Sequence, residues 1–170
     1  MHSYIALLRA VNVGGTGRLP MSELQAMGRA AGFSKVKTYI ASGNVVFQST
    51  ATAKTVKAKL EAHLLAHVGK QVVVAVRTAR EMAAVIESNP FANAPAERTV
   101  AIFLEEAPAA DALDHATGVR GEEMRLGVRE IYVHYRSGIG TSKLRIPAAE
   151  NGTARNLNTI RKLAAMAAGV

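Results

Sequence analysis

Apolar positions in the first 77 residues follow two periods, which predict strands and helices in turn. Residues 4–13 are rich in Ile, Leu and Val and end at a pair of glycines, as expected of a strand that enters a loop. Helical spacing of apolar residues extends over 20–31 and 53–68. Three short apolar segments are predicted to be strands, 36–40, 45–48 and 71–76. The order β-α-β-β-α-β predicts a ferredoxin-like unit with strand order 4-1-3-2.

The pattern after Arg77 predicts a second and smaller α+β subdomain. Helices are predicted over 78–88 and 153–168, a strand over 99–104, and a hairpin formed by 124–126 and 131–135. The predicted boundaries are 1–77 for the ferredoxin-like subdomain and 78–170 for the second subdomain. Segment 71–76 is apolar on both alternating sets, so both faces of its sheet are expected to be covered. We therefore expect the two α+β subdomains to pack against each other.

Composition narrows the chemistry of this chain of 170 residues. Hydrophobic residues make up 49% and charged residues 20%, which is typical of a folded globular protein and excludes disorder. The absence of cysteine excludes thiol catalysis, disulfides and zinc ribbons. His63 and His67 have the spacing of paired metal ligands but no evident third ligand, so neither a metal nor a cofactor is predicted. Without a membrane-spanning segment or a leader, a cytoplasmic protein with no membrane partner is expected.

The net charge of +8 is confined to the first predicted subdomain. Residues 1–77 contain ten Lys or Arg and only two acidic residues, Glu23 and Glu61, whereas residues 78–170 contain eleven of each sign. A one-sided positive field attracts anions, among which nucleic acids are the commonest partners. The alternative is a solvated basic surface that aids solubility. Tyr4 and Phe47 are the only aromatic residues on the presumed central strands. An RNA-recognition sheet stacks bases on two or three aromatic side chains there, so this type of sheet is not favoured.

Three loops are expected at one edge of the first subdomain and form a candidate anion site. The topology places the loop after the first strand, the hairpin and the loop before the fourth strand together. Glycines expose backbone N–H groups, and cations add positive charge, which is how proteins hold phosphate or carboxylate. The candidates at this edge are Asn12, Gly14, Gly15 and Arg18 in the first loop, Ser42, Gly43 and Asn44 in the hairpin, and Lys70 in the third. Alternatively, these glycines and asparagines serve only the turns.

Four further residues extend the candidate site. Arg9 belongs to an otherwise apolar alternating set, so we expect it to reach a ligand or an acidic residue of the second subdomain; the alternative is a solvated position at the end of the sheet. The predicted helix start at residue 153 offers free N–H groups next to Arg155 and Asn156, and Lys143 lies in a glycine-containing segment. If this helix start faces the first loop, a basic cleft results.

Six sequence motifs spread over the chain resemble those of a bacterial family, the domain of unknown function 1697. They are YIALLRAVNVGG from Tyr4, PMSEL from Pro20, YIASGNVVF from Tyr39, NPF from Asn89, SKL from Ser142 and GTARNLNT from Gly152. Members of that family usually have glycine where this chain has Ala10 and tryptophan where it has Leu157. The resemblance implies an α+β fold with a ferredoxin-like first half, and it carries no established activity.

The function that these patterns favour is a soluble, non-enzymatic binding protein for an anionic, phosphate-bearing ligand, such as a nucleotide or nucleic acid. One alternative is a small-molecule enzyme with its site between the subdomains, in which Arg9, Asn44 and Arg155 orient an anionic substrate. A second alternative is a structural interaction domain. The sequence predicts neither the ligand nor the oligomeric state.

Overall fold

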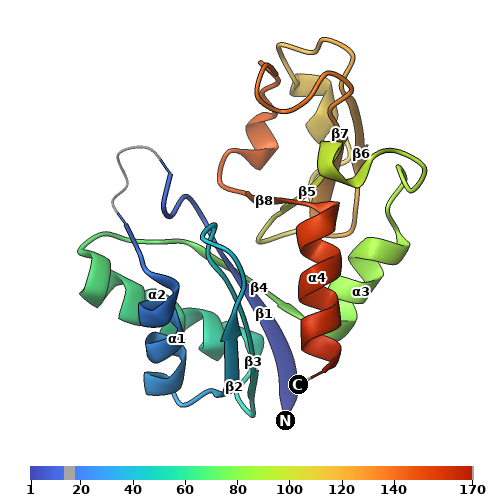
Figure 1. The fold of residues 1–170 in the computed structure, drawn as a ribbon. Coiled ribbons are helices and arrows are strands. Elements are labelled where there is room, and N and C mark those ends of the chain that lie inside the picture. Colours follow the sequence, from blue (N-terminus) through green and yellow to red (C-terminus); the bar gives the residue numbers. More distant parts are fainter. Residues whose placement is uncertain (14–17, 170) are drawn as a thin grey trace. The chain divides into compact units, whose positions relative to one another are not determined.

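The chain folds into two compact units, each with its own antiparallel sheet (Figure 1). The computed structural model describes residues 1–13 and 18–169. Unit 1 consists of Met1–Ala83 and Lys162–Val170, and unit 2 of Ala84–Arg161. Each unit combines helices with a four-stranded sheet, so the fold class is α+β as predicted. The predicted boundary at residue 77 falls inside a strand, and the division into 1–77 and 78–170 remains a prediction.

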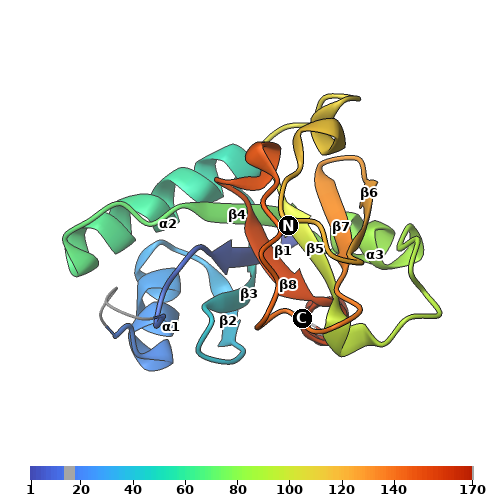
Figure 2. The same cartoon turned by 90° about the horizontal axis from the view of Figure 1, so that it is seen from above.

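Unit 1 has its strands in the order β2-β3-β1-β4, which is the predicted 4-1-3-2 order read from the other edge. Both helices lie over one face of this sheet, and Figure 2 shows α2 running alongside β4. The elements are β1 (His2–Leu8), α1 (Met21–Ala30), β2 (Ser34–Thr38), β3 (Asn44–Ser49), α2 (Ala53–Val68) and β4 (Val74–Thr78).

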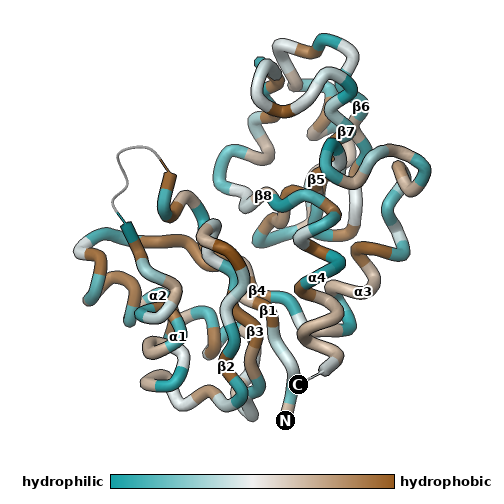
Figure 3. The backbone as a smooth tube through the Cα atoms, in the orientation of Figure 1, coloured by the Kyte–Doolittle hydropathy of each residue, from teal (hydrophilic) through white to brown (hydrophobic). Residues whose placement is uncertain are grey.

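Both faces of the sheet of unit 1 are buried, as its apolar strands predict. The set that faces the helices includes Tyr4 and Phe47, and the Phe47 ring stacks on Phe33 with 4.2 Å between centroids. The opposite set includes Ile5 and Val46, which have no exposed surface. The central strands are accordingly among the most hydrophobic parts of the chain (Figure 3). Since Tyr4 and Phe47 lie in the core, they offer no surface for base stacking.

The first strand is shorter than predicted, because the backbone leaves the extended conformation after Leu8. Ala10 and Asn12 both have a φ of 55°, in the left-handed region that interrupts a strand. Val11 between them is buried. Arg9 therefore lies just beyond β1 and not within its alternating set.

Helix α2 begins and ends where the sequence predicts. Thr52 caps its start by accepting a hydrogen bond from the N–H of Thr55, and Gly69 ends it with a φ of 83°. The predicted apolar line of Val56, Leu60 and Leu64 is fully buried.

Unit 2 has a sheet in the order β6-β7-β5-β8, including the predicted hairpin of β6 (Glu123–Leu126) and β7 (Glu130–His134). Strand β5 (Thr99–Phe103) lies between β7 and β8 (Thr153–Asn156). Helix α3 (Ala79–Glu87) passes from unit 1 into unit 2. Short 3-10 turns are η1 (Ala96–Arg98), η2 (Ala112–His115) and η3 (Pro147–Ala149).

The last helix begins four residues later than predicted. Segment 153–156 forms strand β8, and the helix α4 (Leu157–Ala168) follows directly. Asn156 fixes this start because its Oδ1 accepts a hydrogen bond of 2.9 Å from the N–H of Thr159. Leu157, Ile160 and Leu163 have no exposed surface, as predicted for the core side of this helix.

Candidate functional site

Asn12 organises the loop edge of unit 1. Its Nδ2 donates to the carbonyl oxygens of Leu19 and Ala41, each at 2.8 Å, and its Oδ1 accepts from the N–H of Leu19 at 2.5 Å. One side chain therefore joins the two ends of the first loop and holds them against the hairpin. This is the meeting of the first loop and the hairpin that the topology predicts, with Asn12 in a structural role.

A pocket of about 200 Å³ opens at this edge. Arg18, His67 and Lys70 supply its polar lining together with Asn12, and Val11, Leu19, Val68 and Val72 are among its apolar walls. Lys70 follows the end of α2 and Arg18 follows the first loop, so two connections far apart in sequence place cations around one space. Among the described residues, neither Arg18 nor Lys70 forms an ion pair.

Both acidic residues of the first 77 have partners other than Arg18 and Lys70, and Glu23 pairs with His67 of the pocket lining. Glu23 Oε2 lies 2.5 Å from His67 Nε2, and Glu61 Oε2 accepts a hydrogen bond of 2.7 Å from Lys57 Nζ. The same Glu61 atom accepts from the N–H of Val74, so this ion pair fastens α2 to β4. In the sequence, His67 stands out only through its spacing from His63, which is that of paired metal ligands. His67 lies in the last turn of α2, three residues before Lys70. This position in the sequence could have indicated that His67 belongs to the loop edge of unit 1.

The hairpin candidates are engaged in building the hairpin. Asn44 is fully buried, and its Nδ2 donates to the Tyr39 carbonyl and to Ser42 Oγ, each at 2.9 Å. Gly43 has a φ of 90°, and a side chain there would meet Val11 at 2.6 Å. Only glycine fits this left-handed position against Val11. Gly14 and Gly15 lie outside the described residues.

Arg9 follows β1, and its N–H donates to the carbonyl of Val73 at 3.0 Å. Its side chain is half-buried. The expected pairing of Arg9 with a group of the second subdomain remains a prediction.

The predicted helix start next to Arg155 is wrong, because Arg155 and Asn156 belong to β8. The amide of Asn156 is used to cap α4. Burial lowers the pKa of Arg155 to about 10, and its Nη1 donates to the carbonyl of Ala154. Lys143 is exposed, and its carbonyl lies close to Gly118. Thus the helix α4 begins two residues after Arg155, and the side chain of Asn156 already accepts a hydrogen bond from one of its first N–H groups.

Residues 1–13 and 18–169 contain no group of three or more His, Asp or Glu side chains placed to hold a metal ion. Within the same residues, no helix is both long and apolar enough to cross a lipid bilayer.

Comparison with known proteins finds a similar fold over nearly the whole chain. The solved structure of the conserved bacterial protein SP0830 from Streptococcus pneumoniae is similar to this chain, with a TM-score of 0.80 and 25% sequence identity. The similarity covers 98% of this chain and 98% of that protein. No curated protein matches this chain. The family described as protein of unknown function DUF1697 matches residues 1–132, and the chain therefore belongs to that family.

Proposed function

We propose that this protein binds a small phosphate-bearing anion in the pocket of Arg18 and Lys70 in unit 1. The observation that carries the proposal is that these two cations, without an acidic partner among the described residues, line one space with Asn12. Guanidinium and ammonium groups together offer donors to several phosphate oxygens. Unit 1 also contains twelve Lys or Arg against three Glu, whereas unit 2 contains nine against ten acidic residues. The long-range field therefore favours anions at unit 1.

The size of the pocket restricts what enters it. A volume of about 200 Å³ is below the roughly 300–1,000 Å³ of pockets that enclose a drug-sized ligand. A phosphate group fits, while the remainder of a nucleotide or a polynucleotide would lie outside the pocket. We further infer a ferredoxin-like arrangement for unit 1, which the strand order and the two helices on one face support.

The test is isothermal titration of the full chain with inorganic phosphate, pyrophosphate and a short oligonucleotide at low salt. The variant Arg18→Gln/Lys70→Gln should weaken phosphate binding by about tenfold or more, because each lost charge-assisted hydrogen bond contributes about 1.5–3 kcal/mol. The matched control is Lys54→Gln/Lys59→Gln, which removes two exposed cations of α2 away from the pocket and should leave the affinity within about twofold.

Equal phosphate affinity of the parent and the Arg18→Gln/Lys70→Gln variant at low salt would show that the pocket is not the site. A repeat at increasing salt separates the ligand classes. A diffuse basic surface in place of the pocket is indicated by two results together. Oligonucleotide binding would weaken steeply with salt, and both double variants would weaken it equally.

A further inference from the structure

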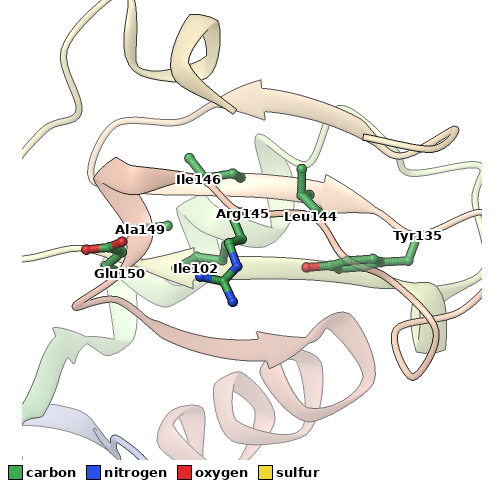
Figure 4. Close-up of a pocket in the computed structure, with 7 residues that line it drawn as sticks. All are labelled: Ile102, Tyr135, Leu144, Arg145, Ile146, Ala149 and Glu150. Atoms are coloured by element: carbon green, nitrogen blue, oxygen red, sulfur yellow. The ribbon is translucent and has the colours of Figure 1, made fainter. Parts of the chain in front are cut away.

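A second pocket lies entirely within unit 2 and has a different chemistry. Its volume is about 280 Å³, and its walls come from β5, the residue after β7, and the segment that includes the turn η3. The residues that line it are Ile102, Tyr135, Leu144, Arg145, Ile146, Ala149 and Glu150 (Figure 4). None of them belongs to the site proposed for phosphate.

Backbone hydrogen bonds hold the walls in place. Arg145 and Thr117 exchange two N–H to carbonyl bonds of 2.9 Å, and Gly118 is so close to the Lys143 carbonyl that a side chain there would meet it at 2.1 Å. The N–H of Tyr135 donates to the carbonyl of Arg98 at 2.8 Å. A cavity with fixed walls needs little ordering when a ligand enters.

Two hydrogen-bond donors face the pocket. Figure 4 shows the guanidinium of Arg145 between the hydroxyl end of Tyr135 and the carboxylate of Glu150. Within the part of the chain that the structure describes, neither the guanidinium of Arg145 nor the hydroxyl of Tyr135 has a hydrogen-bond partner. Burial raises the pKa of Tyr135, with Glu122 adding to the effect, so its hydroxyl keeps its proton at neutral pH. A ligand between these groups must bring acceptor oxygens.

The remaining walls select for an apolar group with a single negative charge. Ile102 and Ile146 are buried members of the core of unit 2, and Leu144 and Ala149 pack against them. This surface favours a short hydrocarbon part. Arg145 is the one cation among the described residues that line this pocket, so a second negative charge on the ligand would have no partner there. A carboxylate therefore suits the pocket better than a phosphate dianion.

We propose that unit 2 binds a small monocarboxylate with a short apolar chain, its carboxylate held by Arg145 and Tyr135 and its hydrocarbon placed against Ile102, Leu144 and Ile146. The planar guanidinium fork pairs with a carboxylate through two parallel hydrogen bonds. The Tyr135 hydroxyl donates a third bond to the same group. This second site is independent of the phosphate pocket in unit 1.

The experiment is a titration of the full chain with isovalerate, followed by amide chemical shifts in NMR. Isovaleramide has the same shape without the charge, and inorganic phosphate has charge without hydrocarbon. We expect shifts at Ile102, Tyr135 and residues 144–150 with isovalerate, and binding at least about tenfold weaker for the amide. No shifts in this segment with isovalerate, or equal binding of isovaleramide, would overturn the proposal.

Variants assign the donors. Arg145→Gln should weaken isovalerate binding by about tenfold or more, and Tyr135→Phe by a smaller factor, because the phenol contributes one neutral hydrogen bond. Arg161→Gln removes an exposed cation of unit 2 outside the pocket and is the matched control. If Arg145→Gln fails to fold, Arg145→Lys keeps the charge without the fork and should still bind several-fold more weakly. Unchanged binding by a folded Arg145 variant overturns the assignment.

Discussion

Among the residues that the structure describes, four other than glycine adopt left-handed backbone conformations, and two of them lie directly after β1 at the loop edge of unit 1. Ala10 and Asn12 flank Val11, and their positive φ angles end β1. Asparagine tolerates this conformation and here gains hydrogen bonds to Leu19 and Ala41. Ala10 is exposed and has a side chain that brings no such compensation. Ala10 occupies the position at which members of the DUF1697 family usually have glycine. The positive φ angle at this position explains why glycine is preferred there.

Replacing Ala10→Gly should stabilise the protein. The left-handed conformation costs an L-residue roughly 1–2 kcal/mol, and glycine removes this cost in the folded state. Part of the gain in stability is offset because glycine also increases the conformational entropy of the unfolded chain. We expect the free energy of unfolding in urea to rise by about 0.5–1 kcal/mol. The control Ala62→Gly, at an exposed position inside α2, should instead lower it by about 1 kcal/mol. A decrease for Ala10→Gly of the same size as for Ala62→Gly would contradict this explanation.

Among the elements of unit 2, α3 and β7 are joined by a buried hydrogen bond. Tyr132 is 1% exposed, and its hydroxyl donates to the carbonyl of Val85 at 2.7 Å. Burial raises the pKa of Tyr132 from 10.0 to about 12. The folded state therefore favours the protonated phenol more than the unfolded state does.

Tyr132→Phe should lower the free energy of unfolding by about 1–3 kcal/mol, since the Val85 carbonyl loses its donor in the interior. The raised pKa also sets a pH dependence. The contribution of Tyr132 is complete below pH 10 and is lost as the pH rises through about 12, because the unfolded phenol ionises first. Urea unfolding between pH 9 and 12 should show a flatter decline for Tyr132→Phe than for Tyr39→Phe. Parallel declines would contradict the assignment.

The predictability of each element follows from how local its determinants are. Helix α2 was predictable at both ends because the Thr52 cap, the period of Val56, Leu60 and Leu64, and Gly69 are all close in sequence. Strand β8 was not predictable, because Thr153–Asn156 becomes a strand only by pairing with β5, far away along the chain.

The candidate sites were likewise predictable only where their determinants are close in sequence or fixed by the topology. Topology placed Asn12 near the hairpin, whereas the meeting of Tyr135 with Arg145 depends on loops that have no sequence pattern.

At the scale of the whole molecule, the two ends of the chain belong to one unit. Lys162–Val170 is grouped with Met1–Ala83, and Lys162 Nζ lies 5.9 Å from the centroid of the Tyr39 ring. Leu163 and Ala167 of this segment are buried. Unit 2 is thus an insertion between two parts of unit 1, and α4 crosses the boundary between them at residue 162.

Two substitutions in α4 should report on different units. Leu163→Ala and Leu157→Ala remove the same group from fully buried positions, and each should cost about 2–5 kcal/mol. Because Leu163 belongs to unit 1 and Leu157 to unit 2, Leu163→Ala should reduce hydrogen-exchange protection mainly in β1 and β3, and Leu157→Ala mainly in β5 and β7. The same pattern of lost protection from both variants would show that the boundary has no energetic meaning.

The insertion has a consequence during biosynthesis. Residues 1–83 of unit 1 leave the ribosome before Ala84–Arg161, yet unit 1 lacks Leu163 and Ala167 until the whole of Ala84–Arg161 has been translated. At roughly 5–20 residues per second, translation of that stretch takes about 4–16 s. For this time unit 1 lacks two of its buried residues, while unit 2 emerges as one continuous segment. All residues of unit 2 are therefore translated before the last segment of unit 1, although the turn of α4 that unit 2 contains is completed only with that segment.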